Sequence, residues 1–240
     1  MTIVSFSGID GAGKSTQISS LEDWLHRSAL RTTLLTFWDD VVCFSRYREF
    51  MSYKAFKGDR GVGSPEKPLH RRDKNISSWP LTLMRFGLYF ADALSLCLKV
   101  RKARKSDADV VIFDRYIYDE LANLPLTHKT ARLFAWFVLK LVPQPDVAYV
   151  IDADPVAAQT RKPEYPLEFV RRNREAYLRL AQLAGNITVV EPDSIPAMKA
   201  RIRLEVLQKL VRTAPNTEAL RSALSSPNPA NISSRELIEP

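Results

Sequence analysis

The feature that most constrains this chain is a glycine-rich segment near its start, GIDGAGKS at residues 8–15. It matches the phosphate-loop pattern G-x-x-x-x-G-K-S/T. The apolar run at residues 3–6 before it predicts a short buried strand. Apolar residues after it, Ile18, Leu21 and Leu25, have the spacing of an amphipathic helix. A strand followed by this loop and then a helix is the context in which the pattern binds phosphate groups.

Each position of the loop predicts a contact to a nucleoside triphosphate, which we take to be ATP. Glycines allow the backbone to curl so that successive N–H groups point at phosphate oxygens. Lys14 is expected to reach the β- and γ-phosphates, and the Ser15 hydroxyl to ligate Mg²⁺. The residues predicted to bind ATP or its phosphates are Gly8, Asp10, Gly11, Ala12, Gly13, Lys14, Ser15 and Thr16.

A second constellation is the pair Asp114-Arg115, which follows the apolar run at residues 110–113. A carboxylate at the carboxyl end of a parallel strand faces the ligand crevice of an open α/β sheet. Asp114 is therefore predicted to hold Mg²⁺ together with Ser15. A cation beside it, Arg115, suits an acceptor phosphate or the developing charge of the transition state. The pair favours transfer to an acceptor over hydrolysis.

Apolar runs and helical periodicity alternate along the chain. Strands are expected near residues 3–6, 33–37, 110–113, 147–151 and 187–190, with helices after the loop and near 81–102, 131–141, 167–184 and 195–210. This alternation predicts an α/β fold, a three-layer αβα sandwich around a parallel sheet. We expect one kinase domain over residues 1–212, with an irregular insertion at 38–80 and a flexible tail at 213–240.

Composition narrows the class of protein. The content of apolar residues (45%) and of charged residues (26%) is that of a globular protein, and no apolar run is long enough to span a bilayer. The first residues lack the basic start of a signal peptide, so a cytoplasmic location without a membrane partner is expected. The net charge of +8 fits phosphorylated substrates. We interpret the basic run at 99–105 as a solvated helix end, and do not expect nucleic acid as a partner.

Taken together, four segments resemble the thymidylate kinase family of P-loop nucleoside monophosphate kinases. They are residues 6–17, residues 114–116, residues 145–161 with the Asp152-Ala153-Asp154-Pro155 sequence, and residues 167–178. The resemblance covers most of positions 1–30 and 105–210. It implies an ATP-dependent phosphotransferase acting on a nucleoside monophosphate, with dTMP as the expected acceptor.

The resemblance also implies roles for particular residues. Asp10 is expected near the sugar 3′-hydroxyl of the acceptor, and Arg115 at its phosphate. A short lid at 161–167 begins at Arg161, which, alone or together with Lys162, supplies the cation that the loop itself lacks. The resemblance further implies a homodimer packed through the long helices, a donor adenine held near residues 191–194, and Phe90 as a stacking platform for the acceptor base. The predicted catalytic residues are Lys14, Asp114, Arg115 and Arg161; the predicted acceptor-binding residues are Asp10, Phe90 and Arg115.

The acceptor region departs from the family pattern. The family's Arg-Glu-Pro-Gly segment is replaced by residues 36–40, and Leu94 stands where an arginine usually reads the thymine carbonyl. After residues 114–116 the family has a serine and Ala-Tyr-Gln, whereas this chain has DELANL at 119–124. A kinase of the same fold acting on a nucleoside, sugar or other alcohol is therefore an alternative, with Asp39, Asp40 or Asp119 as its base. A nucleotide-dependent switch without catalysis is another.

Overall fold

The computed structural model describes residues 1–43 and 79–213. Five strands form one parallel sheet in the order β2-β3-β1-β4-β5. The strands are β1 (Thr2–Ser7), β2 (Thr32–Thr36), β3 (Val110–Asp114), β4 (Val147–Ile151) and β5 (Ile187–Val190). The helices are α1 (Lys14–Arg27), the π-helix η1 (Phe37–Val41), α3 (Trp79–Ala103), α4 (Ile117–Leu121), α5 (Lys129–Leu141), α6 (Pro155–Arg161), α7 (Leu167–Ala184) and α8 (Ile195–Thr213).

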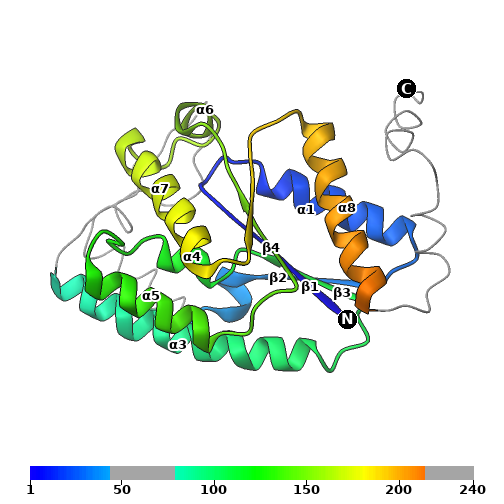
Figure 1. Ribbon diagram of the computed structural model, residues 1–240, viewed down its shortest axis with the longest axis horizontal. Coiled ribbons are helices and arrows are strands. Elements are labelled where there is room, and N and C mark those ends of the chain that lie inside the picture. The colour runs from blue at the N-terminus through cyan, green and yellow to red at the C-terminus, as the bar shows by residue number, and fades with distance from the viewer. Residues whose placement is uncertain (44–78, 214–240) are drawn as a thin grey trace.

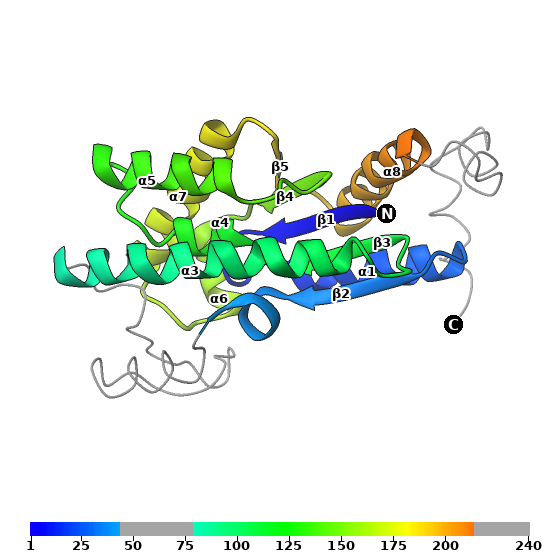
Figure 2. The same cartoon turned by 90° about the horizontal axis from the view of Figure 1, so that it is seen from below.

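Helices cover both faces of the sheet, as the alternating pattern predicts. Helices α1 and α8 pack together on one face, and α3, α4, α5 and α7 lie on the other (Figures 1 and 2). The central strands β1, β3 and β4 are almost wholly buried, which is why they read as continuous apolar runs. The three-layer αβα sandwich is confirmed.

Local structure differs from the sequence expectation in a few places. Strand β2 ends at Thr36, and Phe37, expected in the strand, begins the π-helix η1, where it is fully buried. Two short helices, α4 and α6, were not expected, because five or seven residues are too few to show helical periodicity. Of the insertion predicted at 38–80, residues 44–78 lie outside the described residues, as does the predicted tail from residue 214 onward.

The carboxyl ends of the strands lie along one edge of the sheet. Since Phe6 of β1 lies opposite Asp114 of β3, the phosphate loop and the Asp114-Arg115 pair start side by side at that edge. The ends of β2 and β4 continue into η1 and α6 at the same edge. Open α/β sheets bind ligands there. Among the described helices, none is both long enough and apolar enough to cross a membrane.

Candidate active site

The phosphate loop leaves β1 at Ser7 and enters α1 at Lys14. Three of its residues, Gly8, Gly11 and Gly13, have φ angles of +137°, +82° and +94°, a region that side chains disfavour. At Gly11 space matters as well, because a Cβ there would lie 2.2 Å from the carbonyl oxygen of Ala158 in α6. The loop is therefore shaped by glycine and lies directly against the helix that precedes the predicted lid.

Lys14 is buried beneath this loop. Its ammonium group donates hydrogen bonds to the carbonyl oxygens of Gly8 (2.8 Å) and Ile9 (2.9 Å). Burial, with the nearby charge of Arg115, lowers the pKa of Lys14 from 10.5 to about 7. Burial thus disfavours the charged form of Lys14. A bound anion such as a triphosphate would favour that charged form and raise the pKa of Lys14 again.

Asp114 and Ser15 are the predicted metal ligands. Burial raises the pKa of the Asp114 carboxyl, while Arg115 and Lys14 partly oppose that rise. Ser15 lies exposed in the first turn of α1. No cluster of three or more His, Cys, Asp or Glu side chains suited to a metal occurs in the described part of the chain. Mg²⁺ needs no such cluster, because it binds through one or two protein oxygens together with phosphates and water. Ser15 and Asp114 supply a hydroxyl oxygen and a carboxylate oxygen, which are ligands of the kind that this ion binds.

Arg115 is the cation at the centre of the edge. Its backbone has a φ of +71°, and its N–H donates to the carbonyl oxygen of Phe6 at 2.9 Å. One terminal nitrogen, Nη2, binds the carboxylate of Asp10, and the other, Nη1, lies 2.7 Å from Oδ1 of Asp119. Burial alone would lower the pKa of Arg115, but the two carboxylates outweigh it and raise that pKa well above its usual value. Asp10 and Arg115, each predicted to bind the acceptor, are thus in direct contact.

Two cationic side chains at the start of the lid, those of Arg161 and Lys162, point to different surroundings. Lys162 reaches the site, with its Nζ 3.8 Å from Oδ1 of Asp10 and 3.4 Å from Oε1 of the buried Glu164. Arg161 is exposed, and its Nε donates to the carbonyl oxygen of Ala157 in its own helix at 3.1 Å. The geometry favours Lys162 as the lid cation, and the role of Arg161 stays a prediction.

Phe90 lies in α3, away from these contacts. Its ring stacks on Phe137 of α5, with ring centroids 6.4 Å apart, and it is 37% exposed. Within the described residues, no recorded ring contact, hydrogen bond or ion pair joins it to the phosphate loop. Its role as a platform for a base stays a prediction.

The sequence did not predict that Asp119, Ser7 and Tyr177 form a hydrogen-bonded group at this edge. Asp119, considered only as a base for an alcohol acceptor, is 2% exposed and accepts hydrogen bonds from Ser7 Oγ at 2.5 Å and from Tyr177 OH at 2.8 Å. A base must be able to reach the acceptor, so Asp119 does not suit that role. Its position four residues after the strand-end Arg115 was the available signal.

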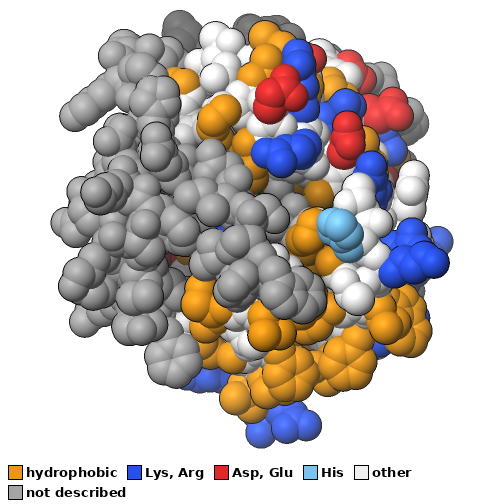
Figure 3. Space-filling view, turned by 90° about the vertical axis from the view of Figure 1, so that its left-hand side faces the viewer, with side chains coloured by type: hydrophobic (Ala, Val, Ile, Leu, Met, Phe, Trp, Pro, Cys, Tyr) orange, Lys and Arg blue, Asp and Glu red, His pale blue; other side chains and the backbone are white. Residues whose placement is uncertain are grey.

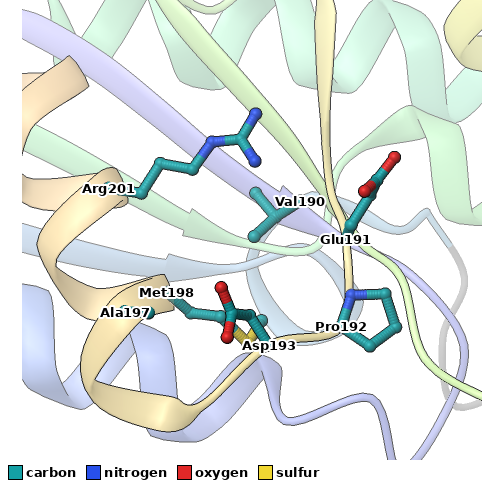
Figure 4. A pocket seen from close by; sticks show the side chains of 7 residues that line it. All are labelled: Val190, Glu191, Pro192, Asp193, Ala197, Met198 and Arg201. Carbon is teal, nitrogen blue, oxygen red and sulfur yellow. The ribbon is translucent and has the colours of Figure 1, made fainter.

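A small pocket of about 110 Å³ lies between the end of β5 and the start of α8 (Figure 4). Its lining includes part of the segment that the family resemblance associates with the donor adenine. The residues that line it are Val190, Glu191, Pro192, Asp193, Ala197, Met198 and Arg201.

Comparison with known proteins finds thymidylate kinases among the relatives. No protein-family model matches the chain. A probable thymidylate kinase of Pyrobaculum aerophilum is 28% identical over 221 residues, which cover 88% of this chain and 99% of that protein. One of Methanosphaera stadtmanae is 24% identical over 86% of this chain and 98% of its own length. The chain is thus similar to thymidylate kinases over most of its length. A thymidylate kinase of Bifidobacterium longum agrees, at 28% identity over 85% of this chain and 96% of that protein.

A solved thymidylate kinase supports the fold. The crystal structure of the Ehrlichia chaffeensis enzyme superposes with a TM-score of 0.55 at 18% identity, over 86% of this chain and 98% of that one. The similarity to thymidylate kinases thus covers most of the chain. At this identity the superposition speaks for the shared sheet and helices and not for the side chains of the acceptor pocket.

Proposed function

We propose that the protein transfers the γ-phosphoryl group of ATP to the phosphate of a nucleoside monophosphate, converting dTMP and ATP to dTDP and ADP. The observation that carries this proposal is the contact of Arg115 with Asp10. It puts a guanidinium suited to an acceptor phosphate directly beside the phosphate loop. The names of the homologues support dTMP as the acceptor.

The transfer itself needs positioning and charge more than acid–base chemistry. An oxygen of the acceptor phosphate attacks the γ-phosphorus in line. The bond from that phosphorus to the β–γ bridging oxygen breaks, and ADP leaves with the electron pair. The attacking oxygen is already anionic, so no general base is required. Lys14 would hold the β- and γ-phosphates, Arg115 the acceptor phosphate, and Lys162 the transferring group.

ATP and Mg²⁺ complete the proposed donor site. Ser15 and Asp114 would hold the ion, whose charge neutralises the β- and γ-phosphates when it is bound. The pocket before α8 is the proposed place of the adenine ring. It lies at the carboxyl end of β5, on the same edge of the sheet as the phosphate loop. We also propose a cytoplasmic location for the enzyme, in keeping with the absence of a signal-peptide pattern at the start of the sequence.

The proposal is tested by incubating the protein with ATP, Mg²⁺ and a panel of acceptors. The panel contains dTMP, the other nucleoside monophosphates, thymidine and small sugars, and ADP and phosphorylated product are measured by chromatography. We expect dTDP from dTMP. Clear transfer to an alcohol with none to any monophosphate would instead favour the alternative kinase. ATP binding without any transfer would favour the switch.

A matched pair of arginine variants ties the activity to the site. Arg115→Ala should lower kcat/KM for dTMP by at least about 100-fold, because it removes a charged contact made to the acceptor phosphate. Arg171→Ala removes a guanidinium that is 51% exposed and paired only to Glu168 among the recorded ion pairs, so the same assay should change less than about twofold. Equal activities of the two variants would refute the placement of the acceptor phosphate at Arg115.

We also propose a homodimer joined through α3 and α5. These two helices expose large apolar side chains that gather on one face, visible at the bottom of Figure 3. Contiguous apolar surface of this kind marks interaction sites. Leu98→Glu, at a position 66% exposed, should convert a dimer to a monomer in sedimentation equilibrium. A wild-type monomer would refute the dimer without touching the proposed reaction. The exposed side chains are Leu83, Met84, Phe90, Leu94 and Leu98 of α3, and Leu133, Trp136, Phe137 and Leu141 of α5.

A further inference from the structure

Asp119 is bound on all sides at the centre of the edge. Its Oδ1 accepts hydrogen bonds from Arg115 Nη1 (2.7 Å) and from Tyr177 OH (2.8 Å). Its Oδ2 accepts from Ser7 Oγ (2.5 Å) and from the backbone N–H of Tyr116 (3.3 Å). The donors come from β1, from the turn after β3 and from α7, so the carboxylate links three elements that are far apart in the sequence. A buried carboxylate with this many donors is held in one position.

The two carboxylates that hold Arg115 differ in freedom. The side chain of Asp10 is 17% exposed and lies in the loop, within reach of Lys162. The side chain of Asp119 is 1% exposed. A guanidinium presents its N–H groups in a rigid fork, so a fixed partner at Nη1 determines where the remaining N–H groups point. Asp119 is therefore the fixed anchor of Arg115, and Asp10 is the exchangeable partner.

We propose that Asp119 is a positioning residue that orients Arg115 toward the acceptor phosphate. This inference rests on the proposed function, and it assigns Asp119 a role in place of the base that an alcohol acceptor would need. Asp119 touches neither substrate. It acts by holding Nη1, so that Arg115 is presented to the acceptor without first having to be ordered. The chain has this carboxylate where the family resemblance expects a serine, so the device is a property of this chain's remodelled acceptor side.

The decisive measurement is a double-mutant cycle on acceptor affinity. Asp119→Asn keeps the shape and removes the charge. It should raise KM for dTMP about tenfold, with kcat and KM for ATP within about twofold of wild type, because a hydrogen bond to a charged group is lost only on the acceptor side. In an Arg115→Ala background, Asp119→Asn should produce no further rise in KM, since the group that it orients is gone.

A matched control and a milder variant sharpen the cycle. Asp152 is another buried carboxylate of the same edge, ion-paired with Arg174 at 2.6 Å, and Asp152→Asn should leave KM for dTMP within about twofold. Tyr177→Phe removes one hydrogen bond to Asp119 and keeps the charge, so it should raise KM for dTMP about threefold. If Asp119→Asn does not fold, Tyr177→Phe carries the cycle. Additive effects in the cycle, or an equal rise in KM for ATP, would overturn the inference.

A second readout does not depend on turnover. In protein labelled with ¹⁵N-arginine, the Nη signals of Arg115 should be resolved in the wild type, since bonds at both terminal nitrogens slow rotation of the guanidinium. Asp119→Asn should average them. Unchanged Arg115 signals in that variant would overturn the anchoring even if the enzyme phosphorylates dTMP. Resolved signals in a wild type that transfers to no monophosphate would refute the proposed function and leave the anchoring standing.

Discussion

Gly11 offers the sharpest test of how the phosphate loop and the lid are joined. The substitution Gly11→Ala adds a Cβ at a backbone with φ of +82°, 2.2 Å from the carbonyl oxygen of Ala158 in α6. Ordinary contact begins near 3.4 Å, so α6 or the loop must move by about 1 Å. Helix α6 leads into the lid, so the perturbation reaches the transferring group through backbone alone.

The magnitude follows from two separable costs. An alanine in a left-handed conformation costs about 1–2 kcal/mol. Overpacking against backbone adds about 1–3 kcal/mol. Gly185→Ala is the matched control, because Gly185 has a φ of +73° but nothing within 4 Å of an added Cβ. The difference between the two variants therefore isolates the contact with α6, at about 2 kcal/mol. For a chain of this length that corresponds to about 4–8 °C in Tm.

The assay is thermal unfolding combined with kcat under saturating substrates. Gly11→Ala should melt about 4–8 °C below Gly185→Ala. It should also lose about 100-fold in kcat, because a misplacement of about 1 Å in a site has that effect. Gly185→Ala should keep wild-type kcat, since Gly185 caps the far end of α7. If the two variants have the same Tm and the same kcat, the close approach of the loop to α6 is refuted.

Three further expectations concern charged groups of the site. Lys14→Met should abolish transfer. The folded-state pKa of Lys14 is lowered to about 7, so wild type gains stability as the pH rises from about 7 to 10.5, and urea titrations across that range should show no such gain in the variant. Asp114→Asn should lower kcat at least about 100-fold but leave the Tm at pH 7 equal or higher. Burial raises the pKa of the Asp114 carboxyl, so its charged form costs stability at pH values above that pKa. A clear drop in the Tm of the variant would contradict this expectation. Lys162→Ala should lower kcat by about 1,000-fold, as loss of a charge at the transferring phosphoryl group does, and Arg161→Ala by less than about threefold. The reverse order in steady-state rates would return the lid role to Arg161.

Local patterns in the sequence were enough for the architecture. Continuous apolar runs predict buried parallel strands, and the loop pattern between the first run and the next helix predicts where phosphate binds. The structure confirms the sheet and both layers of helices. These features were predictable because periodicity and glycine placement act over a few neighbouring residues. The short helices α4 and α6 escaped for the same reason, since each has fewer than eight residues.

Only the tertiary structure decided which charges meet. Asp10 and Arg115 are 105 residues apart, and Tyr177 and Asp119 are 58 apart, yet each pair is hydrogen-bonded. Strand order and register bring them together, and no local pattern encodes either. The same holds for Lys162, which reaches Asp10 because α6 packs against the loop at Gly11. The sequence by itself thus predicted a triphosphate site at residues 8–15. Packing at the sheet edge determined which carboxylates hold the neighbouring arginine, because contact between distant residues depends on the whole fold.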